Sequence, residues 1–293
     1  MKLLILNGLV NGLIVGGIYA LIGVSLTLLY GVLRVVNFAH GEFVIGGSFV
    51  AYVLFQHFGL SPLASLPIAG AAFFGFGWVA YYLLIPRLSR SDDPEAMSFL
   101  LMYGVSIALS AMLLVIFEAD TRSIDYSFNP TSVAIGPVYV STARLVALAV
   151  ALAISALLAW FLFRTLPGKA LRAAIMNREA IQILGVDIGR LSAFAFALAA
   201  ALAGITGVLI ALVFPAFNAF SGGEYAIIGF IVVVLGGLGN PIGALAAGVL
   251  YGVVEQLATV FLPQAMAPMI GFALLVGTIM LRPAGLFGRR ALR

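Results

Sequence analysis

The stretch that decides the fold is GLVNGLIVGGIYALIGVSLTLLY, residues 8–30. The apolar run that contains it is longer than the hydrophobic region of a cleaved signal peptide. It also carries small residues four positions apart, at Gly8, Gly12, Gly16 and Ala20. This spacing puts the small residues on one helix face, where they let a second helix backbone approach closely in a bilayer. We therefore predict a retained transmembrane helix at the centre of a bundle.

The composition of the whole chain indicates a membrane protein. Of the 293 residues, 63% are hydrophobic and 9% are charged, and the mean hydropathy is +1.18. A soluble domain of this size has too little interior to remove so much apolar surface from water. The chain has no cysteine, which excludes disulfides and thiolate metal sites.

Nine apolar runs are candidates for membrane spans, which need about 20 residues each. The seventh run is too short for a simple span, and it ends in GGLGNPIG, residues 236–243. Glycine and proline interrupt a helix there and release backbone groups that lipid cannot satisfy, so we expect a short or discontinuous helix enclosed by protein. The residues of this break are Gly236, Gly237, Gly239, Asn240 and Pro241. The nine runs are 4–30, 39–57, 62–86, 98–118, 141–163, 191–213, 225–238, 243–262 and 266–282.

The distribution of charge predicts the orientation. Segment 164–190 carries five basic and two acidic residues, which is typical of a cytoplasmic loop. Nine crossings with an outer N-terminus also bring the basic tail (Arg282, Arg289, Arg290, Arg293) to the cytoplasm and leave the acidic loop 119–140 outside. If 225–262 were one crossing, the chain would have eight spans and an outer tail. We therefore predict an all-α polytopic bundle of eight to nine spans, forming one transmembrane domain over residues 1–293.

Several kinds of chemistry have no sequence signature in this chain. Gly168 and Lys169 do not belong to a phosphate-binding G-x-x-x-x-G-K-[ST] loop, and neither a zinc-binding H-E-x-x-H helix nor a G-x-S-x-G nucleophile turn occurs. Two histidines are too few for a histidine-rich metal site. We predict that the chain is not an enzyme and holds no metal, and we expect no nucleic-acid partner.

Polar residues within the predicted spans are candidates for a transport path or gate, because ionisable groups are costly in lipid. Asn37, His40 and Glu42 lie in NFAHGEF, residues 37–43, at the start of the second span. They could instead cap a helix that starts near water, with Glu42 at the positive end of the helix dipole. Glu255 lies in mid-span and could line a path or form a structural hydrogen bond between helices. Glu224 precedes the seventh span on the outer side, where helix capping is the simpler interpretation.

The basic segment also predicts a short helix. Asn177 is a suitable N-cap, Glu179 would lie in the first turn, and Gly185 would end the helix. The apolar residues Ala180, Ile181, Ile183 and Leu184 are too many for a freely solvated loop, so they call for a partner surface.

These features together resemble a known family. Glu179-Ala180 followed by Gly185 is similar to the E-A-A…G loop of importer-type ABC permeases, although Ile181 replaces the second alanine and the glycine is displaced by one position. VVNFAHGEFVIGGSFVAY (35–52), GKALRAAIMNREAIQILGVD (168–187), VVVLGGLGNPIGALAAGVLYG (232–252) and LRPAGLFGRR (281–290) resemble the branched-chain amino acid ABC transporter permease family, and in particular its H-type membrane subunit.

The resemblance implies one subunit of a larger transporter in a bacterial or archaeal inner membrane. The expected partners are two cytoplasmic ATPases, which bind ATP and magnesium in place of this chain, a second related permease subunit, and an extracytoplasmic binding protein that selects branched-chain or related amino acids. The short helix would couple the bundle to an ATPase. The residues assigned to this coupling are Lys169, Arg172, Asn177, Arg178, Glu179, Ala180, Ile181, Leu184 and Gly185.

A self-sufficient secondary transporter or channel is the alternative. That class predicts internal repeats with matched broken helices and carboxylates near the midplane. The sequence shows one broken segment and one clear midplane carboxylate, Glu255, which favours the ABC permease.

Overall fold

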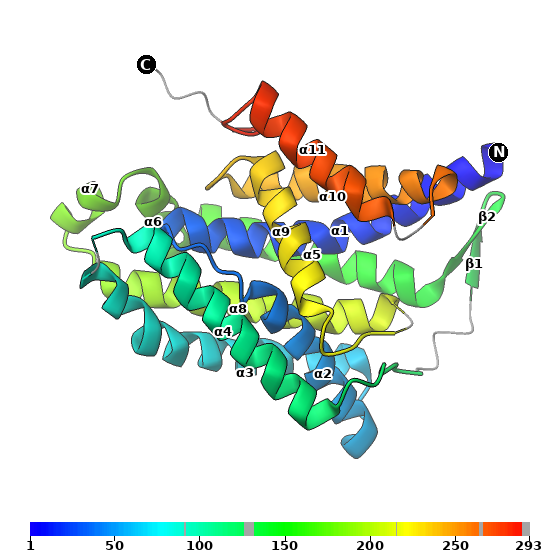
Figure 1. Ribbon diagram of the computed structural model, residues 1–293, viewed down its shortest axis with the longest axis horizontal. Coiled ribbons are helices and arrows are strands. Elements are labelled where there is room, and N and C mark those ends of the chain that lie inside the picture. Colours follow the sequence, from blue (N-terminus) through cyan, green and yellow to red (C-terminus); the bar gives the residue numbers. More distant parts are fainter. Residues whose placement is uncertain (91, 126–131, 215, 264–265, 289–293) are drawn as a thin grey trace.

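The computed structural model describes residues 1–90, 92–125, 132–214, 216–263 and 266–288, which form a bundle of helices with a small hairpin at one end (Figure 1). In chain order the elements are α1 (Lys2–Leu33), α2 (His40–Phe58), α3 (Pro62–Leu84), the 3-10 helix η1 (Ile85–Arg90), α4 (Pro94–Phe117), β1 (Ser132–Ile135), β2 (Val138–Ser141), α5 (Thr142–Arg164), α6 (Leu166–Met176), α7 (Arg178–Ile183), α8 (Ile188–Val213), α9 (Gly222–Gly236), α10 (Pro241–Phe261) and α11 (Ala267–Leu281).

Each of the nine predicted runs coincides with a helix, but the predicted number of spans is not confirmed. Within the described residues, six helices are long and apolar enough to cross a membrane, namely α1, α3, α4, α5, α8 and α10. The apolar helices α9 and α11 have 15 residues each. The 19-residue α2 carries Glu42 and histidines and is not among the six. The chain is therefore a multi-pass helical membrane protein.

The prediction of an all-α structure misses the hairpin of β1 and β2. The two strands pair antiparallel in the loop between α4 and α5, with Ala134 opposite Tyr139 and a turn at Gly136. Val138 and Val140 are buried against Ile14 of α1. The alternation of inward valines with exposed residues is a strand pattern, although it is only four residues long.

Helix α1 lies at the centre of the bundle, as predicted. In the most apolar stretch of 18 residues, 94% of the residues are buried, and the helix packs along α10. The two backbones meet at glycines: a Cβ built on Gly12 would lie 2.6 Å from the Cα of Val253, and one built on Gly16 would lie 2.8 Å from the Cα of Val249. Gly248 and Gly252 of α10 face Ala20 and Gly16 in the same close contact. Dispersion at this short distance replaces the hydrophobic force that lipid removes.

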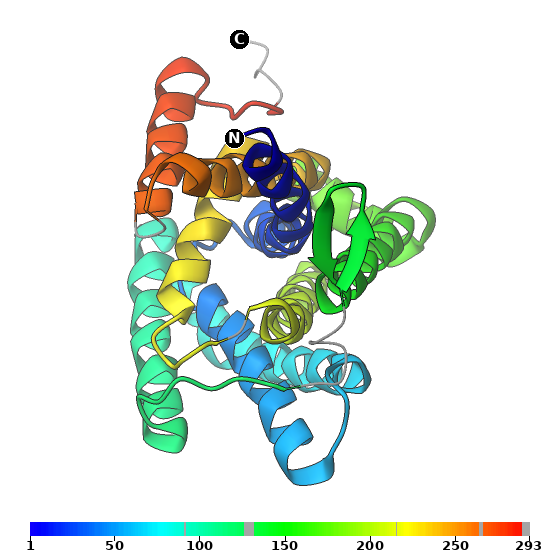
Figure 2. The same ribbon diagram turned by 90° about the vertical axis from the view of Figure 1, so that its right-hand side faces the viewer.

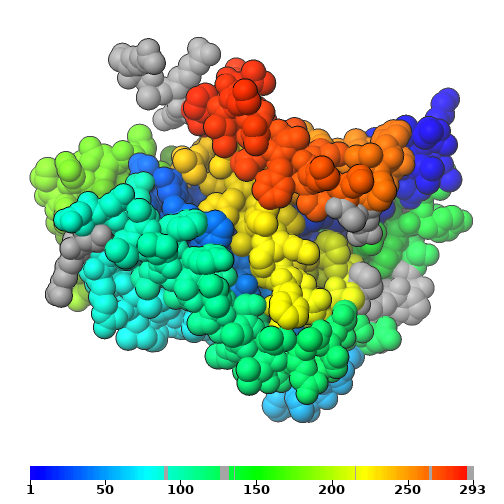
Figure 3. Space-filling view, in the orientation of Figure 1, coloured from blue at the N-terminus to red at the C-terminus, as the bar shows by residue number. Residues whose placement is uncertain are grey.

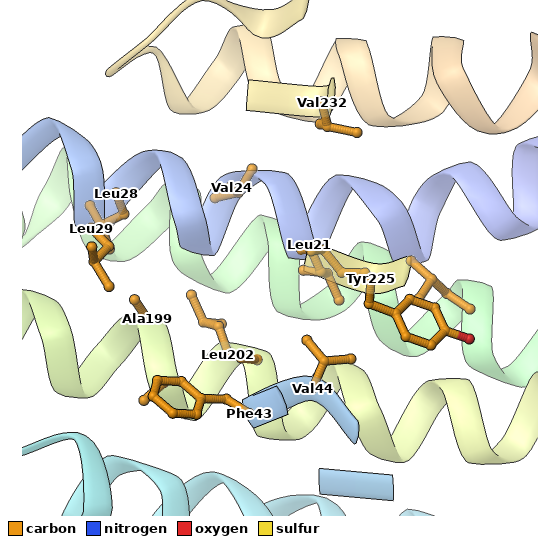
Figure 4. Close-up of a cluster of buried hydrophobic side chains, with 14 of the residues drawn as sticks. Leu21, Val24, Leu28, Leu29, Phe43, Val44, Ala199, Leu202, Tyr225 and Val232 are labelled. Atoms are coloured by element: carbon orange, nitrogen blue, oxygen red, sulfur yellow. The ribbon is translucent and has the colours of Figure 1, made fainter. Parts of the chain in front are cut away.

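Helix α8 is a second central helix, with 89% of its most apolar window buried. It packs along α2 and α3. Figure 2 looks nearly along α1 and α8 and shows both, in blue and yellow-green, surrounded by the other helices. Figure 4 shows Leu21 and Leu29 of α1 near Ala199 and Leu202 of α8, with Phe43 of α2 beside them. These side chains belong to the main buried core.

The helices α1–α4 and α8–α11 form two related halves. The first helix of each half packs along the third helix of the other half, which gives the pairs α1–α10 and α8–α3. The second helix of each half packs on the first helix of the other half, which gives the pairs α2–α8 and α9–α1. The two halves run in opposite directions along the bundle (Figure 1). Their second helices begin with similar sequences, FAHGEF at residues 38–43 and FSGGEY at residues 220–225. The structure therefore contains an inverted repeat, which is a common plan in transporters and was not found in the sequence.

The close contact between α1 and α10 gives a first prediction. Gly248→Leu should lower the thermal stability of the purified protein, because a Cβ at Gly248 would collide with the backbone of Ala20. Overpacking of this kind typically costs roughly 1–3 kcal/mol of unfolding free energy. Thermal unfolding in detergent measures the change.

The matched control for this prediction is Gly75→Leu. Gly75 is an exposed residue of α3, and a Cβ built there would have no neighbour within 4 Å. Equal stability of the two variants would show that the α1–α10 contact does not depend on glycine.

Candidate functional site

Helix α2 begins inside the bundle. After α1 the chain turns at Arg34, which has a φ of 57°, and runs back along α1 before α2 starts (Figure 1). The Nε2 atom of His40, the first residue of α2, lies 2.8 Å from the Oγ atom of Ser25. Ser25 lies about 12 Å before the end of α1 at a helical rise of 1.5 Å per residue. The expectation that this helix starts near water at the membrane surface is therefore wrong.

The polar residues at the start of α2 are buried and only partly hydrogen-bonded. Asn37 and His40 are fully buried, and Glu42 is 6% exposed. The Oε1 atom of Glu42 accepts a hydrogen bond of 3.4 Å from Ser106 of α4. The other carboxylate oxygen, the Nδ1 atom of His40 and both polar atoms of the Asn37 side chain have no hydrogen-bond partner among the described residues.

The suggestion that Asn37 caps α2 is also wrong. The N-cap residue of α2 is Ala39, and no side chain caps this helix. A buried polar group without a partner costs free energy of about 1–3 kcal/mol, and such groups are retained where they serve a function. The Asn37, His40 and Glu42 cluster is therefore a candidate site for a polar ligand.

Helix α9 also begins partway along the bundle, against the start of α2, with its first turn partly exposed. A side chain at Gly222, the first residue of α9, would collide with the Glu42 carboxylate. A Cβ built on Gly41 would lie 2.6 Å from the backbone nitrogen of Ala226. The two equivalent helix starts therefore meet, and each carries a glutamate in its first turn, Glu42 in α2 and Glu224 in α9. Glu224 lies next to this meeting point, in the first turn of α9, where an acidic residue interacts favourably with the helix dipole.

Glu255 is buried in α10 and has a hydrogen-bond partner. Its Oε1 atom accepts a hydrogen bond of 3.2 Å from the hydroxyl of Tyr251, one turn earlier on the same helix. The ring of Tyr251 lies 5.6 Å from the ring of Tyr19 on α1, measured between centroids. The side chain thus lies at the contact between α10 and the central helix.

The residues of the predicted helix break form the connection between α9 and α10. Gly236 ends α9, and Gly237 and Gly239 adopt positive φ values of 88° and 76°. Asn240 caps α10 by accepting a hydrogen bond of 3.1 Å from the backbone nitrogen of Gly243, and Pro241 occupies the first helical position. The chain has a second discontinuity where α9 starts partway along the bundle, and this one was not predicted.

The C-terminal segment folds over this connection. The backbone nitrogen of Leu286 donates a hydrogen bond of 2.8 Å to the carbonyl of Leu235, and the Asn240 amide donates one of 2.8 Å to the carbonyl of Phe287. Residues 281–288 of the motif LRPAGLFGRR therefore pack on GGLGNPIG, although the two segments are distant in sequence. Arg289, Arg290 and Arg293 of the basic tail lie outside the described residues.

The basic segment 164–190 contains two helices, of which one was predicted. α7 begins after Asn177, whose Oδ1 atom accepts a hydrogen bond of 3.0 Å from the backbone nitrogen of Ala180. Gly185 follows the helix with a φ of 82°, a conformation that favours glycine. The unpredicted helix α6 has its own cap, Thr165, which accepts a hydrogen bond of 3.2 Å from Gly168. Thr165 followed by Pro167 is a start signal that the sequence offered.

The two helices lie at one end of the bundle (Figure 1), and apolar side chains are exposed on them. Ile183 is 86% exposed and Leu184 is 80% exposed, whereas Ile181 is buried against the bundle. Arg172 stacks on the ring of Phe163 at 4.1 Å, so it is held against α5. The other residues assigned to coupling are exposed: Lys169, Asn177, Arg178, Glu179, Ala180 and Gly185.

Comparisons with known proteins identify the family. The family described as "Branched-chain amino acid transport system / permease component" matches residues 8–279. The permease protein BraD of a high-affinity branched-chain amino acid transport system in Pseudomonas aeruginosa is 28% identical over 97% of this chain and 96% of its own length.

Two further relatives agree. The corresponding LivH protein of Salmonella typhimurium is 27% identical over 97% of this chain and 96% of its own length. A probable LivH protein of Methanocaldococcus jannaschii is 29% identical over 95% of this chain and 91% of its own length. No solved structure matches the chain significantly. The chain therefore belongs to the family of branched-chain amino acid transport permease components.

Proposed function

We propose that this chain is a membrane-spanning permease subunit of an ABC importer that moves branched-chain or related amino acids. A binding protein outside the membrane would deliver the solute, and two cytoplasmic ATPases, which bind ATP and magnesium, would supply the energy. A second, related permease subunit would complete the path. The observation that carries this proposal is the exposed apolar surface of α6 and α7, on a chain of the permease family.

The charge at the two ends of the bundle supports one orientation in the membrane. α6, α7 and the end of α1 lie at one end, with Arg34, Lys169 and Arg178, and the hairpin lies at the other end (Figure 1). Basic residues collect on the cytoplasmic side of membrane proteins. We place the α6–α7 end in the cytoplasm and the N-terminus outside, in the inner membrane of a bacterial or archaeal cell. Lys2 is an exception to the charge rule.

The α6–α7 surface would couple the permease to an ATPase. Ile183 and Leu184 project from the bundle while Ile181 anchors α7 to it, so a force on the exposed side chains is passed to the helices beneath. Lys169 and Arg178 can pair with acidic groups around an apolar groove on the ATPase. Asn177 and Gly185 fix where the helix begins and ends.

The cluster of Asn37, His40 and Glu42 would form part of the path or a gate within it. It lies where α2 and α9 meet, about 12 Å from the end of α1. Glu255 lies on α10, which packs on α9. Through its hydrogen bond with Tyr251 it would stabilise the bundle, or it would border the path. Rearrangement at this junction would open the path to either side in turn.

A self-sufficient secondary transporter or channel is a second candidate. The matched starts of α2 and α9 favour it, because inverted repeats with interrupted helices are common in that class. The repeat describes how the bundle is built and does not specify its energy source. A test that removes ATP distinguishes the two functions.

We expect uptake to require ATP and the complete complex. Proteoliposomes that contain this chain with its partner permease and ATPases should accumulate radiolabelled leucine when the binding protein is outside and ATP is inside. Omission of ATP should abolish uptake. Uptake by this chain in vesicles without an ATPase would contradict the proposal and support the secondary transporter.

We expect Ile183→Glu with Leu184→Glu to lower the amount of ATPase that co-purifies with the permease by at least roughly tenfold, since buried apolar anchors dominate an interface. Tyr139→Glu is the matched control, because Tyr139 is 75% exposed at the opposite end of the bundle. Full ATPase binding by the double variant would show that α7 is not the docking surface.

A further inference from the structure

Glu224 is an exposed carboxylate partway along the length of the bundle. It lies in the first turn of α9, two residues after Gly222, which contacts the buried Glu42. Further along α9, a Cβ built on Gly229 would lie 3.0 Å from Ile22 in the middle part of α1. Ile22 is about 16 Å from the nearer end of α1 by the helical rise. The hydrocarbon core of a bilayer is about 30 Å thick, so this level of the bundle lies within it.

A carboxylate at this depth cannot face lipid without a large cost. Glu224 forms no hydrogen bond or ion pair with another described residue. Figure 3 shows its helix, α9, exposed at the surface between α11 and α4. This face of the chain must therefore border water or another protein subunit instead of lipid.

Buried polar groups point to a ligand at the same place. The unpaired Oε2 atom of Glu42 lies against Gly222, beneath the first turn of α9. Asn37 and His40, which shortly precede Glu42 in the chain, also have unpaired atoms. A ligand with several N–H donors would satisfy the acceptors of this group, and an ammonium group has three.

The helices that meet at this position carry acidic residues but no basic residue away from their ends. Glu42, Glu224 and Glu255 lie on α2, α9 and α10, and α9 packs on both of the other helices. Among the described residues, every lysine and arginine of α1–α5 and α8–α11 lies in the first or last turn of its helix. The local field thus favours a cationic group over an anionic one.

We propose that Glu224 lines the translocation path and binds the ammonium group of the solute, on a face of this chain that a second membrane subunit closes. This inference rests on the proposed function, because it assumes that an amino acid is the solute. It assigns a specificity-determining role to Glu224, which helix capping alone would not explain.

A cysteine at position 224 tests whether the residue lines an aqueous path. The natural chain has no cysteine, so Glu224→Cys introduces a single thiol. In the assembled complex in membranes, a positively charged, membrane-impermeant methanethiosulfonate should modify this thiol, and roughly tenfold faster than the negatively charged counterpart. Bound binding protein loaded with leucine should slow the reaction.

Leu152→Cys is the matched control. Leu152 is 58% exposed near the middle of α5, on a helix far from α9 in the bundle. This thiol should react with a neutral, membrane-permeant maleimide but with neither charged reagent. A Glu224→Cys thiol that behaves like the Leu152→Cys thiol would show that Glu224 faces lipid and would overturn the inference.

Transport by charge variants tests the role of the carboxylate. In complexes purified at the wild-type subunit ratio, Glu224→Gln should lower ATP-driven leucine uptake by at least roughly tenfold, because it removes one partner of a buried charge pair, whereas Glu224→Asp should retain more uptake. Unchanged uptake by Glu224→Gln would overturn the inference and leave the proposed function intact. A wild-type complex that imports no amino acid would overturn both.

Discussion

The structure depends on one constraint, which is that backbone inside a bilayer must have its polar groups satisfied by protein. α2 and α9 begin partway along the bundle, so the polar backbone groups of their first turns need protein or water around them. Close contacts between helix backbones hold the surrounding helices together. Gly47 and Gly207 bring α2 and α8 into contact, and Ser48 donates a hydrogen bond of 2.7 Å to the carbonyl of Gly207. A similar close contact between α1 and α10 joins the first half to the second half.

The inverted repeat lets the two halves be compared as a pair. Phe73 of α3 and Tyr251 of α10 occupy similar positions, three residues after the Ala-Gly pairs 69–70 and 247–248. Tyr251 contacts Gly271, so α11 closes on α10. In the first half, an apolar cavity of about 400 Å³, lined by Phe73, lies between α2, α3 and α4. The two halves therefore differ in how closely the fourth helix packs on the third: α11 contacts α10, whereas a cavity lies beside α4 and α3. They also differ at the glutamate of the second helix, since Glu42 is buried and Glu224 is exposed.

Sequence predicted the elements that depend on local chemistry. Residue spacing located the central helix, Asn177 and Gly185 located both ends of α7, and the nine apolar runs located nine helices. It did not predict features that depend on distant contacts. Whether a helix begins at the membrane surface or partway along the bundle depends on what packs around its first turn, and the residues near 40 and 222 do not by themselves indicate this. The similarity of FAHGEF and FSGGEY was the available signal for the inverted repeat, but it covers only six positions.

The α6–α7 end of the bundle and the polar junction of α2 and α9 are joined by α9. Its last residues are fixed at the α6–α7 end, where Gly239 in the following turn contacts Ile175 of α6 and Leu286 bonds to Leu235. Its first residue contacts Glu42. A rigid helix of 15 residues spans about 22 Å between these points. If α6 and α7 dock an ATPase as proposed, a displacement there would be passed along one short helix to the place where the buried polar groups meet, without requiring the long central helices to bend.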